Sequence, residues 1–283
     1  MKRQAVKVLA SILGLGLVVS LSGCSQSQTP TPDVSASTTP TPNASPTVAF
    51  QALAQYWVAD TARGLRLYRE FVRINPTPDA MTAALRHLVS ARPVDSDYSS
   101  LWPIGTTINS VTIQGDTAII DLTFPKLNVG GEAESLAIAQ LVWTATAADT
   151  TVKKISLTVD GKKVETLAGH VDATKAFMRG PSYEVLAPIW ITSPTEGQRV
   201  AAEGFTLSGM ASTFEANVAW KVIKDGVVIK QGSTTALEAA PAWKPWSVEI
   251  SGLVSGAYQF LAMEYSAKDG SLVAQDSKNV VIK

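Results

Sequence analysis

The sequence predicts an α+β protein in which an α/β sandwich domain (48–170) is followed by a β-sandwich (187–283), with a connector (171–186) between them. Two observations predict this order. In the first region, stretches with a helical spacing of apolar residues alternate with strand-like stretches. In the second region, only short strand-like stretches occur, separated by turn residues.

The first 23 residues have the pattern of a signal peptide. A basic start is followed by an apolar run at 8–19, which is short for a membrane span. Leu21-Ser22-Gly23 then leads into Cys24, the only cysteine of the chain. Small residues before a cysteine are typical of a bacterial lipoprotein signal, in which the thiol receives a diacylglycerol and cleavage makes Cys24 the N-terminus. A general secretory signal with an incidental cysteine is the alternative.

Lipidation of Cys24 would place the protein on the extracytoplasmic face of the cell membrane. It would also leave no thiol, which excludes disulfides, a cysteine zinc site and a cysteine nucleophile. Removal of the first 23 residues takes away three basic residues and no acidic one, so the mature chain carries three more acidic than basic residues. A nucleic-acid partner is not expected, because it would require a clustered basic surface.

A spacer follows the cysteine. Residues 24–47 consist mainly of Ser, Thr, Pro, Gln and Ala, with too little apolar surface to form a core and with prolines that keep the chain extended. We expect the segment to act as a tether that holds the folded part away from the membrane.

The first folded region is predicted to contain five strand segments and two helices. Thr77 is predicted as the N-cap of the first helix, which runs to about Ser90, and acidic residues in the first turn mark the second helix at 132–148. Helices packed on one sheet are the expected arrangement. The strand segments are Tyr56-Trp57-Val58, 64–74, 108–113, 118–122 and 152–159.

Several runs in this region resemble the GerMN domain of sporulation and germination proteins. They are Leu101 to Thr106, Val111-Thr112-Ile113 with Ala118 to Leu122, Gln140 to Thr146, and Val159-Asp160-Gly161. The resemblance covers roughly residues 50–170. Because the family includes ring-building relatives, it implies self-association or docking on other envelope proteins.

The second region is predicted to form about seven short strands, which is typical of an immunoglobulin-type sandwich. It resembles the immunoglobulin-like domain of bacterial spore-germination proteins. The runs that carry the resemblance are Ile191 to Pro194, Leu207-Ser208-Gly209, Phe214 to Val218, Pro245-Trp246 and Lys268 to Ser271.

The residues that could perform catalysis are few. His87 and His170 have no partner at a zinc-ligand spacing, so no metal or other cofactor is expected. Asp95 and Asp97 could suggest the paired carboxylates of a glycosidase, but two loop residues so close in sequence have no defined separation. We therefore expect a protein that is not an enzyme.

Three residues are candidates for binding. Trp243 and Trp246 bracket a loop, and an exposed tryptophan is a typical anchor for a partner. Glu215 stands in the most specific motif of the second region. It is interpreted either as a structural hydrogen-bond acceptor at a strand start or as a ligand contact.

The sequence as a whole predicts a lipid-anchored binding or scaffolding protein of the cell envelope, related to sporulation and germination proteins. Its expected partners are the membrane through the lipid, an envelope protein or the cell wall, and a second copy of itself. The alternative is a regulator or inhibitor of an envelope enzyme or sensor. A wall hydrolase is disfavoured because no acid/base constellation is evident.

Overall fold

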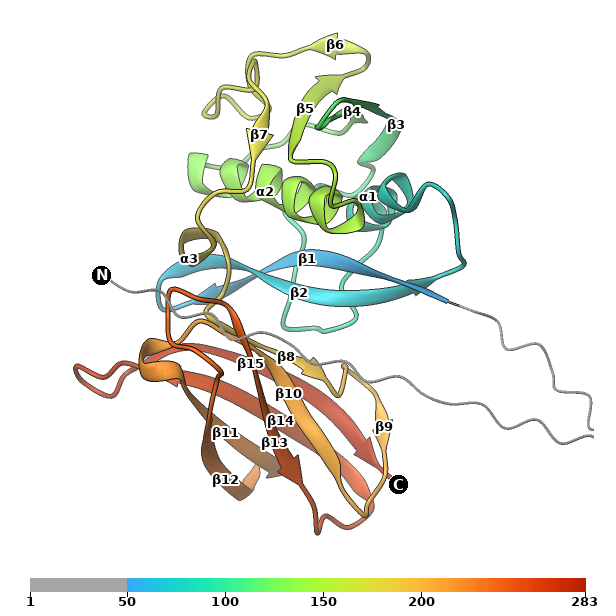
Figure 1. Cartoon of the computed structure of the whole chain (residues 1–283). Coiled ribbons are helices and arrows are strands. Elements are labelled where there is room, and N and C mark those ends of the chain that lie inside the picture. Colours follow the sequence, from blue (N-terminus) through green and yellow to red (C-terminus); the bar gives the residue numbers. More distant parts are fainter. Residues whose placement is uncertain (1–49) are drawn as a thin grey trace, which may run out of the picture. The chain divides into compact units, whose positions relative to one another are not determined.

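The computed structural model describes residues 50–283 (Figure 1). Cys24, the signal-like segment and the spacer lie outside the described residues. No helix among residues 50–283 is long and apolar enough to cross a membrane.

The first block of elements contains two sheets. Strands β1 (Gln51–Thr61) and β2 (Gly64–Ile74) form an antiparallel hairpin that is a sheet of its own. The second sheet has the order β3-β4-β5-β6, with β7 paired to β5, and its β4 and β5 run parallel. Its strands are β3 (Thr107–Gln114), β4 (Thr117–Thr123), β5 (Lys154–Val159), β6 (Lys162–Lys163) and β7 (Phe177–Met178).

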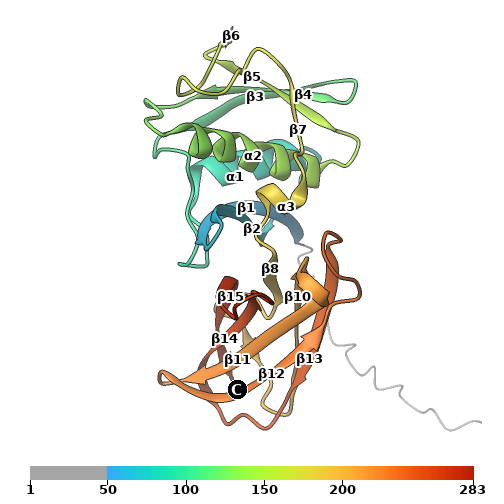
Figure 2. The same cartoon turned by 90° about the vertical axis from the view of Figure 1, so that its left-hand side faces the viewer.

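Helices α1 (Ala80–Ser90) and α2 (Gly131–Ala148) lie between these two sheets, as Figures 1 and 2 both show. The prediction of helices packed on one sheet was therefore incomplete, since a second sheet covers their other side. The reason lies in α2, where buried residues occur all around the helix rather than on one face. A helix that is apolar all around needs partners on both sides.

The beginning of α1 differs from the prediction. Asp79, and not Thr77, is the N-cap, because the Asp79 carboxylate accepts a hydrogen bond from the Thr82 N–H at 3.0 Å. Thr77 lies two residues earlier, and its hydroxyl accepts a hydrogen bond from the Asp79 N–H at 3.3 Å. Both residue types are good N-caps, so the sequence alone does not separate them.

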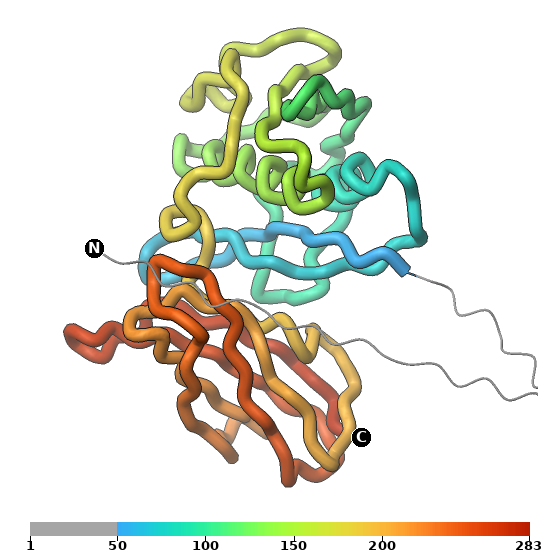
Figure 3. The backbone as a smooth tube through the Cα atoms, viewed as in Figure 1, coloured from blue at the N-terminus to red at the C-terminus, as the bar shows by residue number. Residues whose placement is uncertain are grey.

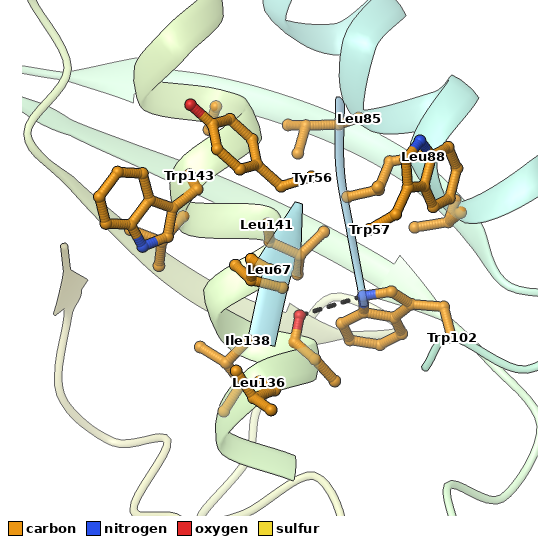
Figure 4. Close-up of a cluster of buried hydrophobic side chains, with 14 of the residues drawn as sticks. Tyr56, Trp57, Leu67, Leu85, Leu88, Trp102, Leu136, Ile138, Leu141 and Trp143 are labelled. Carbon is orange, nitrogen blue, oxygen red and sulfur yellow. Dashed lines mark hydrogen bonds between the residues drawn. The ribbon is translucent and has the colours of Figure 1, made fainter. Parts of the chain in front are cut away.

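The core of the first block is rich in aromatic side chains (Figure 4). Trp57 and Leu67 of the hairpin are fully buried in this core. Trp102 donates a hydrogen bond from its indole Nε1 to the carbonyl oxygen of Ala137 at 3.1 Å, which ties the loop after α1 to the middle of α2. The apolar positions predicted for α1 are confirmed as buried: Met81, Ala84, Leu85 and Leu88.

The second block is a sandwich of a three-stranded sheet (β13-β10-β8) and a five-stranded sheet (β12-β11-β14-β15-β9). The predicted strands are all present, and the missed β9 has only two residues. Figure 3 follows the chain into this block through the short helix α3 (Ser182–Val185). The strands are β8 (Ile189–Ser193), β9 (Arg199–Val200), β10 (Phe205–Ala211), β11 (Asn217–Lys224), β12 (Val227–Thr235), β13 (Lys244–Ile250), β14 (Gly256–Tyr265) and β15 (Leu272–Ile282).

Gly209 sits at a bulge in β10, where its pairing with β8 shifts register. A Cβ atom at this position would lie 1.9 Å from the carbonyl oxygen of Trp190 and 2.9 Å from the Trp246 ring. We expect Gly209→Ala to lower the free energy of unfolding by about 2–3 kcal/mol, because the backbone of β8 must move to admit the methyl group. Denaturant unfolding measures this loss. Gly180→Ala is the control for local crowding, since its backbone is not left-handed and the nearest atom to its added methyl group would be 3.5 Å away, on Val185.

Candidate binding site

Trp243 lies just before β13 and is half-buried. Its ring stacks on that of Trp190 in β8, with 4.4 Å between the ring centroids and 23° between the planes. Trp190 itself is only 3% exposed, so it supports the more accessible ring of Trp243 from below. The prediction that one of the two loop tryptophans reaches the surface therefore fits Trp243 alone.

Trp246 is 2% exposed and belongs to the core of the sandwich. Its position in β13 directs the ring toward Gly209 of the neighbouring strand, whose missing side chain makes room for it. Trp246 packs into this core and does not line the hollow beside Trp243, so it is not part of the candidate site described below.

A hollow of about 320 Å³ opens beside the two stacked rings. We call it the tryptophan–arginine hollow. Most of its wall is apolar or aromatic. Ser182 and Tyr56 contribute the two hydroxyl groups of the lining. Its lining residues are Tyr56, Arg69, Trp143, Arg179, Ser182, Leu186, Trp190, Met210 and Trp243.

Two guanidinium groups border this hollow. The Cζ atom of Arg179 lies 4.3 Å from the ring centroid of Trp143, and its Nε donates a hydrogen bond to the Thr146 hydroxyl at 2.7 Å. The Cζ atom of Arg69 lies 5.2 Å from the ring centroid of Trp190. Among residues 50–283, neither arginine forms an ion pair. The hollow therefore combines stacked aromatic walls with two positive charges that no carboxylate neutralises.

The Tyr56 side chain lines the same hollow as the two arginines, and both of their charges act on its hydroxyl. Burial raises the pKa of Tyr56, while the guanidinium groups of Arg69 and Arg179 act in the opposite direction. The hydroxyl remains protonated at neutral pH and offers a neutral hydrogen-bond donor in the lining of the hollow.

A second hollow of about 220 Å³ adjoins the first, and Leu186 and Trp243 line both. Glu264 of β14, at 5% exposure, borders it. Burial raises the pKa of Glu264, and its Oε1 accepts a hydrogen bond from the Phe214 N–H at 3.2 Å. Its Oε2 has no hydrogen-bond partner among the described residues.

Glu215 does not have the structural role that one interpretation of the sequence gave it, and a ligand contact at this residue stays a prediction. It is exposed in a short turn (Phe214–Ala216) with a left-handed backbone, φ 53°. Within residues 50–283 its carboxylate accepts no hydrogen bond that would stabilise the strand start. Glu264, 49 positions further along the chain, takes the acceptor role at this turn through the Phe214 N–H, and the local motif holds no signal for that distant partner.

Asp95 and Asp97 do not form a catalytic pair. Asp95 is 1% exposed and accepts a hydrogen bond at 2.5 Å from the ammonium of Lys278 in β15. Asp97 accepts a hydrogen bond from the Ser277 hydroxyl at 2.5 Å. Lys278 and Ser277 both belong to β15, so Asp95 and Asp97 join their loop to the sandwich. Lys278 also contacts Asp276 of the same strand at 2.9 Å.

The two histidines are apart from these hollows. His87 is half-buried on α1, where burial lowers its pKa, and His170 is exposed in the loop after β6. Across residues 50–283, no group of three or more His, Cys, Asp or Glu side chains is placed to hold a metal ion.

Comparison with known proteins identifies both blocks. Residues 54–165 match the family model described as sporulation and spore germination, and residues 188–271 match that of the immunoglobulin-like domain of bacterial spore germination. The predicted resemblance to both families is confirmed. The matches support a role associated with sporulation or germination, and neither family is described as a family of enzymes.

Solved structures with similarity to the chain include two from Bacillus subtilis. The first GerMN domain of the sporulation protein GerM is 20% identical over 46% of this chain and 98% of that one, with a TM-score of 0.38. The tandem GerMN domains of GerM are also 20% identical, over 52% and 51% of the two chains, with a TM-score of 0.42. A search of curated proteins gave no match.

Sequence reasoning found Trp243 but missed the residues that complete its site. Arg69, Arg179 and Tyr56 come from segments that are remote from residue 243 in sequence, and nothing in their local patterns distinguishes them from ordinary strand or loop residues. Only the fold brings them together.

Proposed function

We propose that this chain is a lipid-anchored binding protein of the cell envelope, without catalytic activity, that acts in a process related to sporulation or germination. The tryptophan–arginine hollow carries the binding part of the proposal. Tryptophan, tyrosine, methionine and arginine are the residue types enriched at the centres of protein interfaces, and all four line this hollow.

The domain arrangement and location complete the proposal. A lipid on Cys24 and a tether at 24–47 would present a GerMN-like domain (48–170) and an immunoglobulin-like domain (187–283) outside the membrane. The engagement of Asp95 by Lys278 and of Asp97 by Ser277 supports the non-catalytic part of the proposal, because these two carboxylates are then not available as a catalytic pair.

Replacing the cysteine tests the location. We expect Cys24→Ser to abolish lipid incorporation, because only the thiol can receive the diacylglycerol. The variant should fail to incorporate labelled fatty acid and should not mature at residue 24, whereas Ser25→Ala should behave like the original chain. Equal labelling of the Cys24→Ser chain would contradict the lipoprotein assignment.

Recovery of the tagged full chain after cross-linking on intact cells tests the binding role. We expect a defined envelope protein to be recovered with it. Recovery of the chain alone, without any partner, would contradict binding to another protein.

A further inference from the structure

We infer that the tryptophan–arginine hollow binds an acidic segment of a partner protein, in which a carboxylate lies next to an aromatic or aliphatic side chain. The inference rests on the proposed binding function and names the chemistry of its partner. Two features of the hollow carry it: guanidinium groups that have no counter-charge, and an aromatic wall beside them.

The charge of the site favours an anion. Arg69 and Arg179 both border the hollow, and no acidic side chain is among its nine lining residues. Neither guanidinium has an ion-pair partner within residues 50–283. A guanidinium group is planar and matches a carboxylate with two parallel hydrogen bonds, so a carboxylate is the anion that this arrangement suits best.

The two arginines are held in place before any ligand arrives. Arg179 is fixed by its hydrogen bond to Thr146 and by its position over the Trp143 ring. Arg69 lies between the rings of Phe71 and Trp190, with its Cζ atom 4.8 Å and 5.2 Å from their centroids. Preorganised side chains lose less conformational entropy on binding, which favours affinity.

The wall of the hollow determines what accompanies the carboxylate. Trp143 and Trp190 are 6% and 3% exposed, and Trp243, Met210 and Leu186 extend the apolar surface. A sugar ring would bring several hydroxyl groups that need hydrogen-bond partners, but Ser182 and Tyr56 are the only uncharged hydroxyl side chains in the lining. An apolar side chain next to a carboxylate matches this surface better than a saccharide does.

A pair of small probes that differ only in charge tests the inference on the purified full chain. N-acetylphenylalanine carries a free carboxylate, and N-acetylphenylalaninamide is its neutral counterpart. Phenylalanine does not interfere with tryptophan emission, so the stacked pair Trp190–Trp243 can report binding. We expect the carboxylate probe to bind with a Kd on the order of 1 mM and the amide at least about fivefold more weakly.

Substitutions assign this preference to the arginines. Arg179→Gln and, separately, Arg69→Gln should remove the preference for the carboxylate, while Arg179→Lys should retain part of it. Arg199→Gln is the matched control, because Arg199 is an exposed arginine of β9 that lines neither hollow. The melting temperature of each variant shows whether it is folded. If the Arg179 variants are unstable, Arg69→Gln alone shows whether the preference for the carboxylate depends on the arginines.

Three results would overturn the inference. Equal binding of the two probes would show an apolar site without carboxylate recognition. No response to either probe would show that the hollow takes no such ligand. Binding of N-acetylmuramic acid in the absence of binding of N-acetylphenylalanine would assign the site to a wall saccharide instead. Each of these can occur while cross-linking on cells still recovers a partner, so failure here is distinct from failure of the proposed function.

Discussion

Replacement of Lys278 by methionine is expected to lower the free energy of unfolding by about 3–5 kcal/mol. The Lys278 ammonium is buried and donates hydrogen bonds to Asp95 at 2.5 Å and to Asp276 at 2.9 Å. Both carboxylates are almost completely buried, so removal of the cation leaves them without a counter-charge. Denaturant unfolding of the purified protein measures the loss.

Two variants show whether the loss comes from the stranded carboxylates. Lys268→Met changes an exposed lysine of the loop before β15 and should alter stability by less than about 0.5 kcal/mol. Adding Asp95→Asn and Asp276→Asn to Lys278→Met should recover part of the stability, because the uncompensated charges are then gone. A loss below about 1 kcal/mol in Lys278→Met would contradict this account.

The contribution of Lys278, Asp95 and Asp276 to the free energy of unfolding is also expected to depend on pH, at the alkaline end. Burial disfavours the charged form of Lys278, but the attraction of Asp276 and Asp95 outweighs it and holds the pKa of Lys278 above its usual 10.5. The stabilisation is therefore fully present below the pKa of an unfolded lysine. It is lost as the pH rises through the higher pKa of the folded state. The Lys278→Met variant should lack this alkaline loss.

Replacement of Glu134 by glutamine is expected to lower the free energy of unfolding by about 3–5 kcal/mol. The reason is that the buried Glu134 carboxylate accepts four backbone hydrogen bonds. The donors are the N–H groups of Leu167, Ala168, His170 and Val171, at 2.8–3.2 Å. An amide has one acceptor oxygen, so its NH₂ group would face two of these donors. The first turn of α2 would then lose its hold on the loop after β6, which hydrogen exchange of that loop detects.

Glu132→Gln is the matched control for this change. Glu132 lies in the same first turn of α2 but is exposed, so its substitution should cost only a few tenths of a kcal/mol through the helix dipole. Unchanged protection of the 167–171 loop in the Glu134→Gln variant would contradict the proposed anchoring.

Glu134 should also contribute to acid unfolding. Burial alone would raise its pKa, but the four backbone N–H groups outweigh burial and hold the pKa below its ordinary value of 4.5. The stabilisation is present above the pKa of an unfolded glutamate and is lost as the pH falls through the lower folded pKa. The original chain should therefore lose more stability than Glu134→Gln when the pH is lowered from 6 to below 4.

Local patterns were sufficient to predict most elements of this fold. The Asp225-Gly226 turn, with both residues in the left-handed region, joins β11 to β12 as expected, and alternating apolar residues identified β4. The separation of β1 and β2 into a sheet of their own was not predicted, since strand periodicity contains no information about which sheet a strand joins.

The burial of three polar residues of β15 was also not predictable from local patterns. Asp276, Ser277 and Lys278 are three consecutive polar residues, a pattern normally found at the surface, yet all are buried in β15. Their partners, Asp95 and Tyr98, lie about 180 residues earlier in the chain. The tryptophan–arginine hollow likewise depends on contacts between distant segments.

Site-specific photo-cross-linking tests the central claim most directly. A photoreactive phenylalanine analogue would replace Trp243 in the full chain on intact cells, and in a second strain it would replace Val228, an exposed residue of β12 that lines neither hollow. We predict a covalent product with one envelope protein from position 243 and not from position 228. No product from position 243, or the same products from both positions, would contradict a binding site at the tryptophan–arginine hollow.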